Sequence, residues 1–190
     1  MLRLKVSMSI KELFEIRRMG FLISPVKVVF KSSVSNIRLG SLQIEAVMEG
    51  SSMSLPLWAA DVLAKNGFVD IQEENFSDDF FRSVAKEKLL KDSVNLSQLD
   101  DGFYINLIDF IKRKRTENSS DVPLRNDFLK IHNDASDLVS IRIRKILHYA
   151  RTYSETSDVL PKLTLEERIL LQTLQKDVNE LTSSIFEKGE

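Results

Sequence analysis

The sequence contains no cysteine among its 190 residues. This absence excludes disulfide bonds, thiolate metal ligands and cysteine nucleophiles, and it is typical of a reducing intracellular compartment. Histidine is nearly absent too, and His132 and His148 are too far apart to form the His-x-x-x-His pair of a helical zinc site. The six glycines form no phosphate-binding loop and no Gly-x-Ser-x-Gly motif. We therefore expect a protein that is not an enzyme and that holds no cofactor or metal.

Long hydrophobic runs are also missing. No apolar stretch approaches the ~20 residues that a membrane-spanning helix needs, and the N-terminus lacks the apolar region of a signal peptide. Hydrophobic residues nevertheless make up 43% of the chain, which is enough to bury a core at this length. We expect a soluble, unprocessed intracellular protein without membrane contact.

Paired carboxylates are the remaining catalytic candidates. Three such pairs occur: Asp78-Asp79, Asp100-Asp101 and Glu166-Glu167. Each pair lies at the start of a predicted helix, where the helix dipole favours an acidic side chain without any catalytic role. A metal-dependent hydrolase assembled from distant carboxylates is the weakest of the alternatives that the sequence leaves open.

The net charge of −1 conceals an alternating pattern. Residues 1–60, 61–111, 112–151 and 152–190 have net charges of +4, −6, +5 and −4. Blocks of this size are typical of surfaces that meet oppositely charged partners, and solvated helix faces give the same pattern.

The first third of the chain predicts a small β unit. Ser9 and Glu12 form a capping box for a short helix that Gly20 can end. Residues 26–31 are β-branched and predict a strand, while apolar residues alternate over 37–46. The alternation changes parity at Gly40-Ser41, which indicates a tight turn or a bulge.

The rest of the chain predicts helices. Apolar residues recur at helical spacing over 57–65, from Ser77 onward, over 100–115, over 123–152 and from Thr164 onward. Thr164 and Glu167 form a second capping box. The predicted fold class is mainly α with a small β-domain (α+β). A β-rich domain covers residues 1–55, and a bundle-like helical domain covers residues 56–190.

The last predicted helix carries a regular apolar seam. The seam residues follow one another at steps of three and four: Leu171, Leu174, Val178, Leu181 and Ile185. Such a seam predicts either packing against the chain's own long helix or a helix–helix subunit interface.

Two basic clusters are candidates for DNA or partner contact. Lys112, Arg113, Lys114 and Arg115 end one predicted helix, and Arg142, Arg144, Lys145 and Arg151 lie near the end of the next. Basic clusters of this kind bind phosphate backbones, and cations at helix C-termini also stabilise the helix dipole. A third interpretation, for Arg142, Arg144 and Lys145, is pairing with the acidic blocks 61–111 or 152–190 of this or another subunit.

The order of these parts resembles a known family. A small β unit is followed by a helix that starts at Pro56, Leu57 and Trp58, and this matches the Pro-Leu-Trp-like helix start of one subunit type of the GINS complex of DNA replication. Phe103 and Tyr104 open an apolar helix as the family's aromatic pair does. Asp137 and the segment 142–147 are similar to its arginine- and lysine-bearing central helix.

The resemblance implies a non-catalytic scaffold. It implies a 2:2 heterotetramer with a sister subunit whose domains run in the opposite order, and binding to the MCM replicative helicase and a RecJ-like protein. It also implies contact with primase or polymerase and an intracellular, chromosome-associated location, which is the cytoplasm in an archaeal cell. Pro56, Leu57, Trp58, Phe103 and Tyr104 would then be core or domain-junction anchors. The alternative function is a helical nucleic-acid-binding protein that uses the clusters 112–115 and 142–151.

Overall fold

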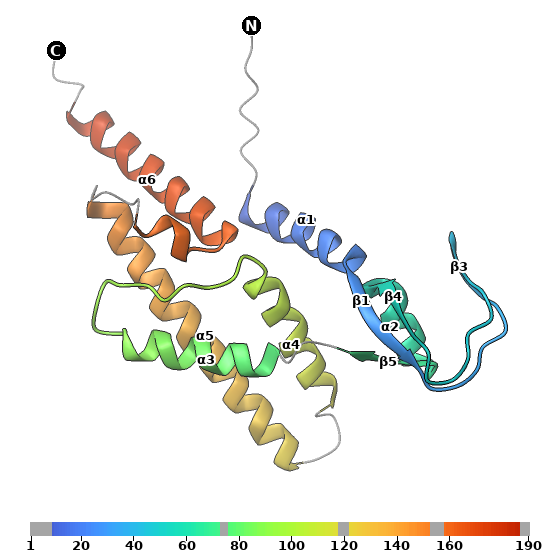
Figure 1. The fold of residues 1–190 in the computed structure, drawn as a ribbon. Helices are drawn as coiled ribbons and strands as arrows, with labels where there is room; N and C mark the ends of the chain where they lie inside the picture. The colour runs from blue at the N-terminus through green and yellow to red at the C-terminus, as the bar shows by residue number, and fades with distance from the viewer. Residues whose placement is uncertain (1–8, 73–75, 118–121, 153–157, 187–190) are drawn as a thin grey trace, which may run out of the picture. The chain divides into compact units, whose positions relative to one another are not determined.

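The computed structural model describes residues 9–72, 76–117, 122–152 and 158–186. The predicted fold class is confirmed: the chain is mainly helical, with one three-stranded and one two-stranded antiparallel sheet (Figure 1). It divides into two compact units. The small unit comprises Phe14–Asn75, and the helical unit comprises Phe76–Glu190 together with the residues up to Leu13.

The small unit is built on a three-stranded sheet. Its elements are α1 (Ile10–Ile23), which begins in the helical unit, β1 (Pro25–Phe30), β2 (Ile37–Leu39), β3 (Leu42–Ile44), β4 (Ser52–Pro56), α2 (Leu57–Lys65) and β5 (Val69–Gln72). Strand β1 is central and pairs antiparallel with β4 and with β5. Strands β2 and β3 form a separate hairpin whose turn contains Gly40 at φ +58°, a conformation that glycine adopts without strain.

One face of the sheet is covered by α2. Val28 and Phe30 alternate with exposed or half-buried neighbours on β1 and are fully buried against Ala60 and Leu63 of α2. The helix ends where the sequence predicts, because Gly67 at φ +77° carries the chain out of the last turn.

The unit boundary differs from the one expected from the sequence. The expected boundary lies between residues 55 and 56, whereas the structure groups α2 and β5 with the sheet. The reason is that β5 supplies one edge of the sheet and α2 covers its core. The sequence does not predict β4 or β5 as strands: their apolar residues do alternate with polar ones, but the runs are only five and four residues long.

The helical unit contains the remaining elements. These are α3 (Phe76–Leu89), α4 (Phe103–Glu117), α5 (Val122–Thr152), a 3-10 turn η1 (Leu160–Lys162) and α6 (Leu165–Phe186). Both capping boxes are confirmed: Glu12 and Ser9 bond each other's backbone N–H, and so do Glu167 and Thr164. Helix α1 continues past Gly20 to Ile23, because the next residue that disfavours helix is Ser24, which precedes Pro25.

Two apolar clusters form the interior of the helical unit. The first cluster joins α3, α4 and the N-terminal half of α5 around Phe80, Phe103 and Leu138. The second cluster joins the C-terminal half of α5 to η1 and α6 around Ile146, Leu163 and Leu171. Helix α5 runs through both clusters, so it is the axis of the unit.

Phe80 provides a test of the first cluster. It is fully buried and contacts Phe76 and Phe110, whereas its neighbour Phe81 is 38% exposed. Phe80→Ala should lower the free energy of unfolding by about 3–5 kcal/mol because it leaves a cavity in the core. Far-UV circular dichroism during urea unfolding measures this loss. The matched control, Phe81→Ala, should lose much less, and equal losses would contradict the assigned core.

Candidate functional site

A layer of polar and charged side chains lies between the two apolar clusters of the helical unit. Along α5, Leu138 belongs to the first cluster and Ile146 to the second, and Arg142 and Lys145 lie between them. Both cations are buried: Arg142 is 0% exposed and Lys145 is 4% exposed. Two charges removed from water require partners, because an unpaired buried ion is strongly unfavourable.

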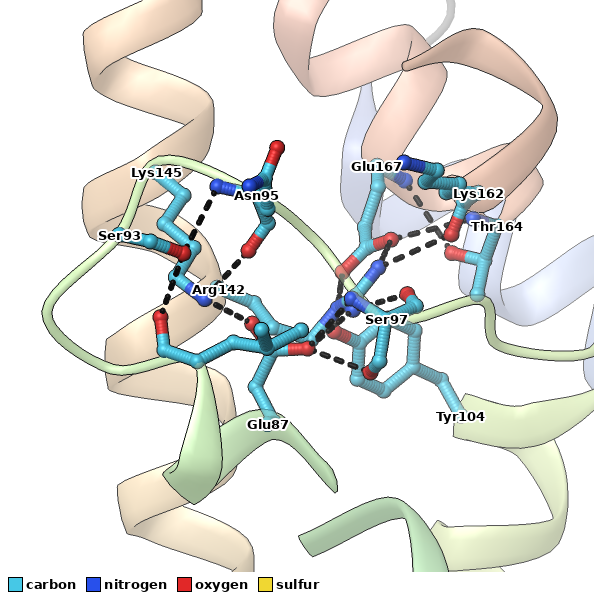
Figure 2. A network of polar contacts seen from close by, with 11 residues as sticks. Glu87, Ser93, Asn95, Ser97, Tyr104, Arg142, Lys145, Lys162, Thr164 and Glu167 are labelled. Carbon is cyan, nitrogen blue, oxygen red and sulfur yellow. Dashed lines mark hydrogen bonds and ion pairs between the residues drawn. The ribbon is translucent and has the colours of Figure 1, made fainter. Parts of the chain in front are cut away.

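Arg142 has all of its hydrogen-bond donors occupied (Figure 2). Its Nε and Nη2 donate to the two carboxylate oxygens of Glu167 at 2.6 and 2.7 Å. Its Nη1 donates to Glu87 Oε2 at 2.9 Å and to the carbonyl of Ser97 at 2.8 Å. Its Nη2 also donates to the carbonyl of Lys162 at 3.1 Å. A guanidinium has five N–H donors, so these five bonds satisfy it completely.

Glu87 is the second centre of the layer. It lies near the C-terminal end of α3 and is 0% exposed. Its Oε1 accepts a bond from Lys145 Nζ at 2.6 Å, and its Oε2 accepts bonds from Arg142 and from the backbone N–H and hydroxyl of Ser97. Lys145 Nζ donates a further bond to the carbonyl of Asn95 at 2.7 Å. The carboxylate therefore connects α3 to α5 and to the segment between α3 and α4.

Glu167 completes the layer from α6. Besides binding Arg142, its Oε1 accepts a bond from the Tyr104 hydroxyl at 2.7 Å, and its Oε2 accepts the backbone N–H of Thr164 at 3.1 Å. One side chain thus caps its own helix and binds both α4 and α5. The buried layer contains two cations and two carboxylates, so its formal charge is zero.

The pKa values of the layer follow from this pairing. Burial alone raises the pKa of Glu87, but hydrogen bonds from Lys145 and Ser97 and the charge of Arg142 outweigh it, so the net pKa lies below its usual value. Burial alone lowers the pKa of Arg142, but the bonds and charge of Glu167 raise it overall. Burial and the Glu167 charge raise the pKa of the Tyr104 hydroxyl, which stays protonated as a donor. We conclude that the layer is a structural ion-pair network.

The structure corrects the interpretation of the second basic cluster. Arg142 and Lys145 have almost no exposed surface that DNA or a partner could contact, and they pair with carboxylates of the same chain instead. The expectation that this cluster pairs with the acidic blocks 61–111 and 152–190 is confirmed for these two residues, through Glu87 and Glu167. Arg144 is exposed on α5 and stays a candidate for contact.

The first basic cluster lies at the C-terminal end of α4. Lys112 and Arg115 are exposed, whereas Arg113 and Lys114 are half-buried. Arg113 pairs with Asp109, one turn earlier, at 2.9 Å. Lys112 and Arg115 therefore have solvent-accessible side chains at this helix end.

The predicted seam of α6 is buried at one end and exposed at the other. Leu171 is 1% exposed and belongs to the second cluster, and Leu174 packs against that cluster. Val178 is half-buried, and Leu181 and Ile185 are 64% and 62% exposed. Packing within the helical unit thus accounts for Leu171 and Leu174. A subunit interface stays a prediction for Leu181 and Ile185.

The predicted anchor residues are divided between the units. Leu57 is buried at the start of α2, where Pro56 and Trp58 are half-buried. Phe103 is buried in the first cluster of the helical unit, and Tyr104 adjoins the polar layer. Phe103 is therefore a core residue as predicted, and Tyr104 has an additional role as hydrogen-bond donor.

Within residues 9–72, 76–117, 122–152 and 158–186, no three histidine or carboxylate side chains are grouped so that they could hold a metal ion. Of the helices in this part of the chain, none is both long and apolar enough to span a bilayer.

Glu87 is not among the site residues that the sequence predicts. The sequence predicts Glu167 as a capping residue and as half of a carboxylate pair at a helix start, and it predicts no role for Asn95 or Ser97. The available signal was one acid at a position of α3 where helical periodicity places a buried residue, three residues after Val84. The position of Glu87 in this pattern does not reveal that Arg142 and Lys145 are its ion-pair partners.

Comparison of the chain with known proteins assigns it to no family. The chain matches no model of a protein family, and it matches no curated protein.

Glu87→Gln tests the polar layer. The substitution keeps the shape but removes the negative charge between Arg142 and Lys145, so it should lower the free energy of unfolding by about 3–5 kcal/mol at neutral pH. The control is Lys88→Ala, which removes a more exposed pair with Asp134 and Asp137 and should cost less than about 1 kcal/mol.

The same variant should also change the pH dependence. Because the pKa of Glu87 is lowered by folding, its stabilisation is present above the ordinary carboxyl value of 4.5 and is lost as the pH falls through the folded pKa. The difference in unfolding free energy between wild type and Glu87→Gln should therefore become smaller as the pH is lowered below 4.5. A difference that stays constant down to acid unfolding would show that Glu87 is not the ionised partner.

Proposed function

We propose that this protein is a non-catalytic scaffold subunit of the GINS type, which assembles with a sister subunit and activates the MCM replicative helicase through protein–protein contacts. The observation that carries the proposal is the order of the two units: a small β-containing unit with α2 starting at Leu57, followed by a helical unit. This order is that of the subunit type which the sequence resembles.

Exposed apolar side chains on two helices support the proposal. Ile16, Met19 and Ile23 lie on one face of α1 and are mostly exposed, and Leu181 and Ile185 extend the seam of α6. Large apolar residues repeated along one helix face are typical of protein–protein interfaces. The partners of the proposal are the sister subunit with the opposite domain order, the helicase, a RecJ-like protein and primase or polymerase.

The proposal predicts a stable mixed assembly. Co-expression with a protein of the opposite domain order should give a complex that sediments with the mass of two copies of each chain. Its addition to the MCM ring should increase the rate of duplex unwinding, and the ring without it serves as the control. If this chain sediments independently of every such candidate, the proposal fails.

A second candidate function is nucleic-acid binding by the end of α4. The observation that favours it is the exposure of Lys112 and Arg115 on one short stretch of helix. Binding of this kind weakens steeply with salt, because each phosphate contact releases counterions.

Charge reversal tests this second function. Lys112→Glu with Arg115→Glu should abolish most of the affinity for labelled DNA in fluorescence anisotropy and should reduce the slope of log affinity against log salt by about 2. The matched control is Lys65→Glu, an exposed lysine at the end of α2. Unchanged affinity of the double variant would remove this candidate.

A further inference from the structure

The end of α6 extends beyond the helix against which it packs. Arg142 contacts Glu167, and Ile146 and Leu171 belong to the same cluster, so α5 and α6 run side by side in the same direction (Figure 1). Helix α5 ends at Thr152, and at this register α6 continues past that level from about Asp177 onward. This explains why Leu181 and Ile185 are exposed although they continue a buried seam.

The exposed end of α6 is acidic as well as apolar. We define the α6 tail surface as Asp177, Val178, Glu180, Leu181 and Ile185. From residue 177 to residue 186 the helix contains two acids and no base. Among the described residues, neither acid has an ion-pair partner.

The outer side of α5 has the opposite character. We define the α5 outer surface as Ile143, Arg144, Leu147 and Arg151. Ile143 and Leu147 are one turn apart and are 42% and 44% exposed. Arg144 and Arg151 are exposed, and within the part of the chain that the structure describes they form no ion pair. From residue 138 to residue 152 the helix contains no acid.

We infer that the α6 tail surface of one copy of this chain docks on the α5 outer surface of a second copy. The two surfaces match in kind: each has two large apolar residues one turn apart, and their flanking charges are of opposite sign. A single copy cannot satisfy both surfaces, because its own α6 already packs on the inner side of its α5. In a two-fold dimer this contact occurs twice, once in each direction, so every copy of both surfaces is used and the assembly closes.

The complementary charges of the two surfaces favour a second copy as the occupant. Two basic surfaces or two acidic surfaces would repel each other, whereas the pairing of α6 tail with α5 outer surface brings unpaired opposite charges together. The inference concerns copies of this chain alone and uses residues of the helical unit only. It therefore does not require the proposed sister subunit.

The test uses two charge-reversed forms of the full chain. One carries Arg144→Glu with Arg151→Glu, and the other carries Asp177→Arg with Glu180→Arg. Sedimentation of the wild-type chain should show a reversible dimer with twice the mass of the 21.8 kDa chain. Each form alone brings like charges together in both contacts, so its dimer dissociation constant should rise about tenfold or more.

Mixing the two forms provides the decisive measurement. An equimolar mixture places acid against base in both contacts, so it should recover the wild-type dissociation constant as a heterodimer. The control form, Asp127→Arg with Lys130→Glu, reverses two exposed charges nearer the start of α5 and should dimerise as wild type does. Far-UV circular dichroism verifies that every form is folded.

Three outcomes would overturn the inference. These are a wild-type chain that is monomeric at all concentrations, reversed forms that dimerise normally, and a mixture that does not regain the dimer. The experiment contains no sister subunit, so a negative result would contradict the self-dimer but not the proposed function. The co-expression experiment tests the proposed function separately. Conversely, a self-dimer that ignores the sister subunit would support this contact and contradict the proposed function.

Discussion

The arrangement of the helical unit depends on the buried guanidinium of Arg142. Removing an arginine from water is unfavourable by several kcal/mol unless its charge and all of its donors are compensated. The compensation here comes from α3, from α6 and from two backbone carbonyls in different connections. Each of these groups must be in place for Arg142 to be buried, and so the positions of four separate segments are linked through one side chain.

This linkage has a different effect from that of apolar packing. The clusters around Phe80 and Ile146 tolerate small shifts of one helix along another, since apolar contacts have little directional preference. A bidentate pair between Arg142 and Glu167 tolerates much less, because both N–H···O bonds must remain aligned. The apolar clusters thus supply most of the stability, and the polar layer between them selects one register of α6 on α5.

The sequence predicts the helices well and the polar layer poorly, and the reason is physical. Helical periodicity, Pro56 and the two capping boxes are local signals, so the helix positions follow within a few residues. Strands β4 and β5 are defined by pairing with β1, which is a non-local property of the fold. Burial of Arg142 is also non-local: the same residue in the same helix would be a surface cation if Glu87 and Glu167 did not converge on it. Arg144, two positions later on the same helix, is exposed. The local sequence alone therefore does not distinguish the buried arginine from the exposed one.

The separation of the network's members along the chain has a consequence for synthesis. Glu87 is 55 residues before Arg142, and Arg142 is a further 25 residues before Glu167. On the ribosome α3 and α4 emerge while the cation that neutralises Glu87 has not yet been made, so this part of the chain cannot reach its final packing early. The first apolar cluster contains no residue of α6, but the apolar residues of α5 around Ile146 stay incompletely covered until α6 is translated, and during that interval they are the surface on which a nascent-chain chaperone would act.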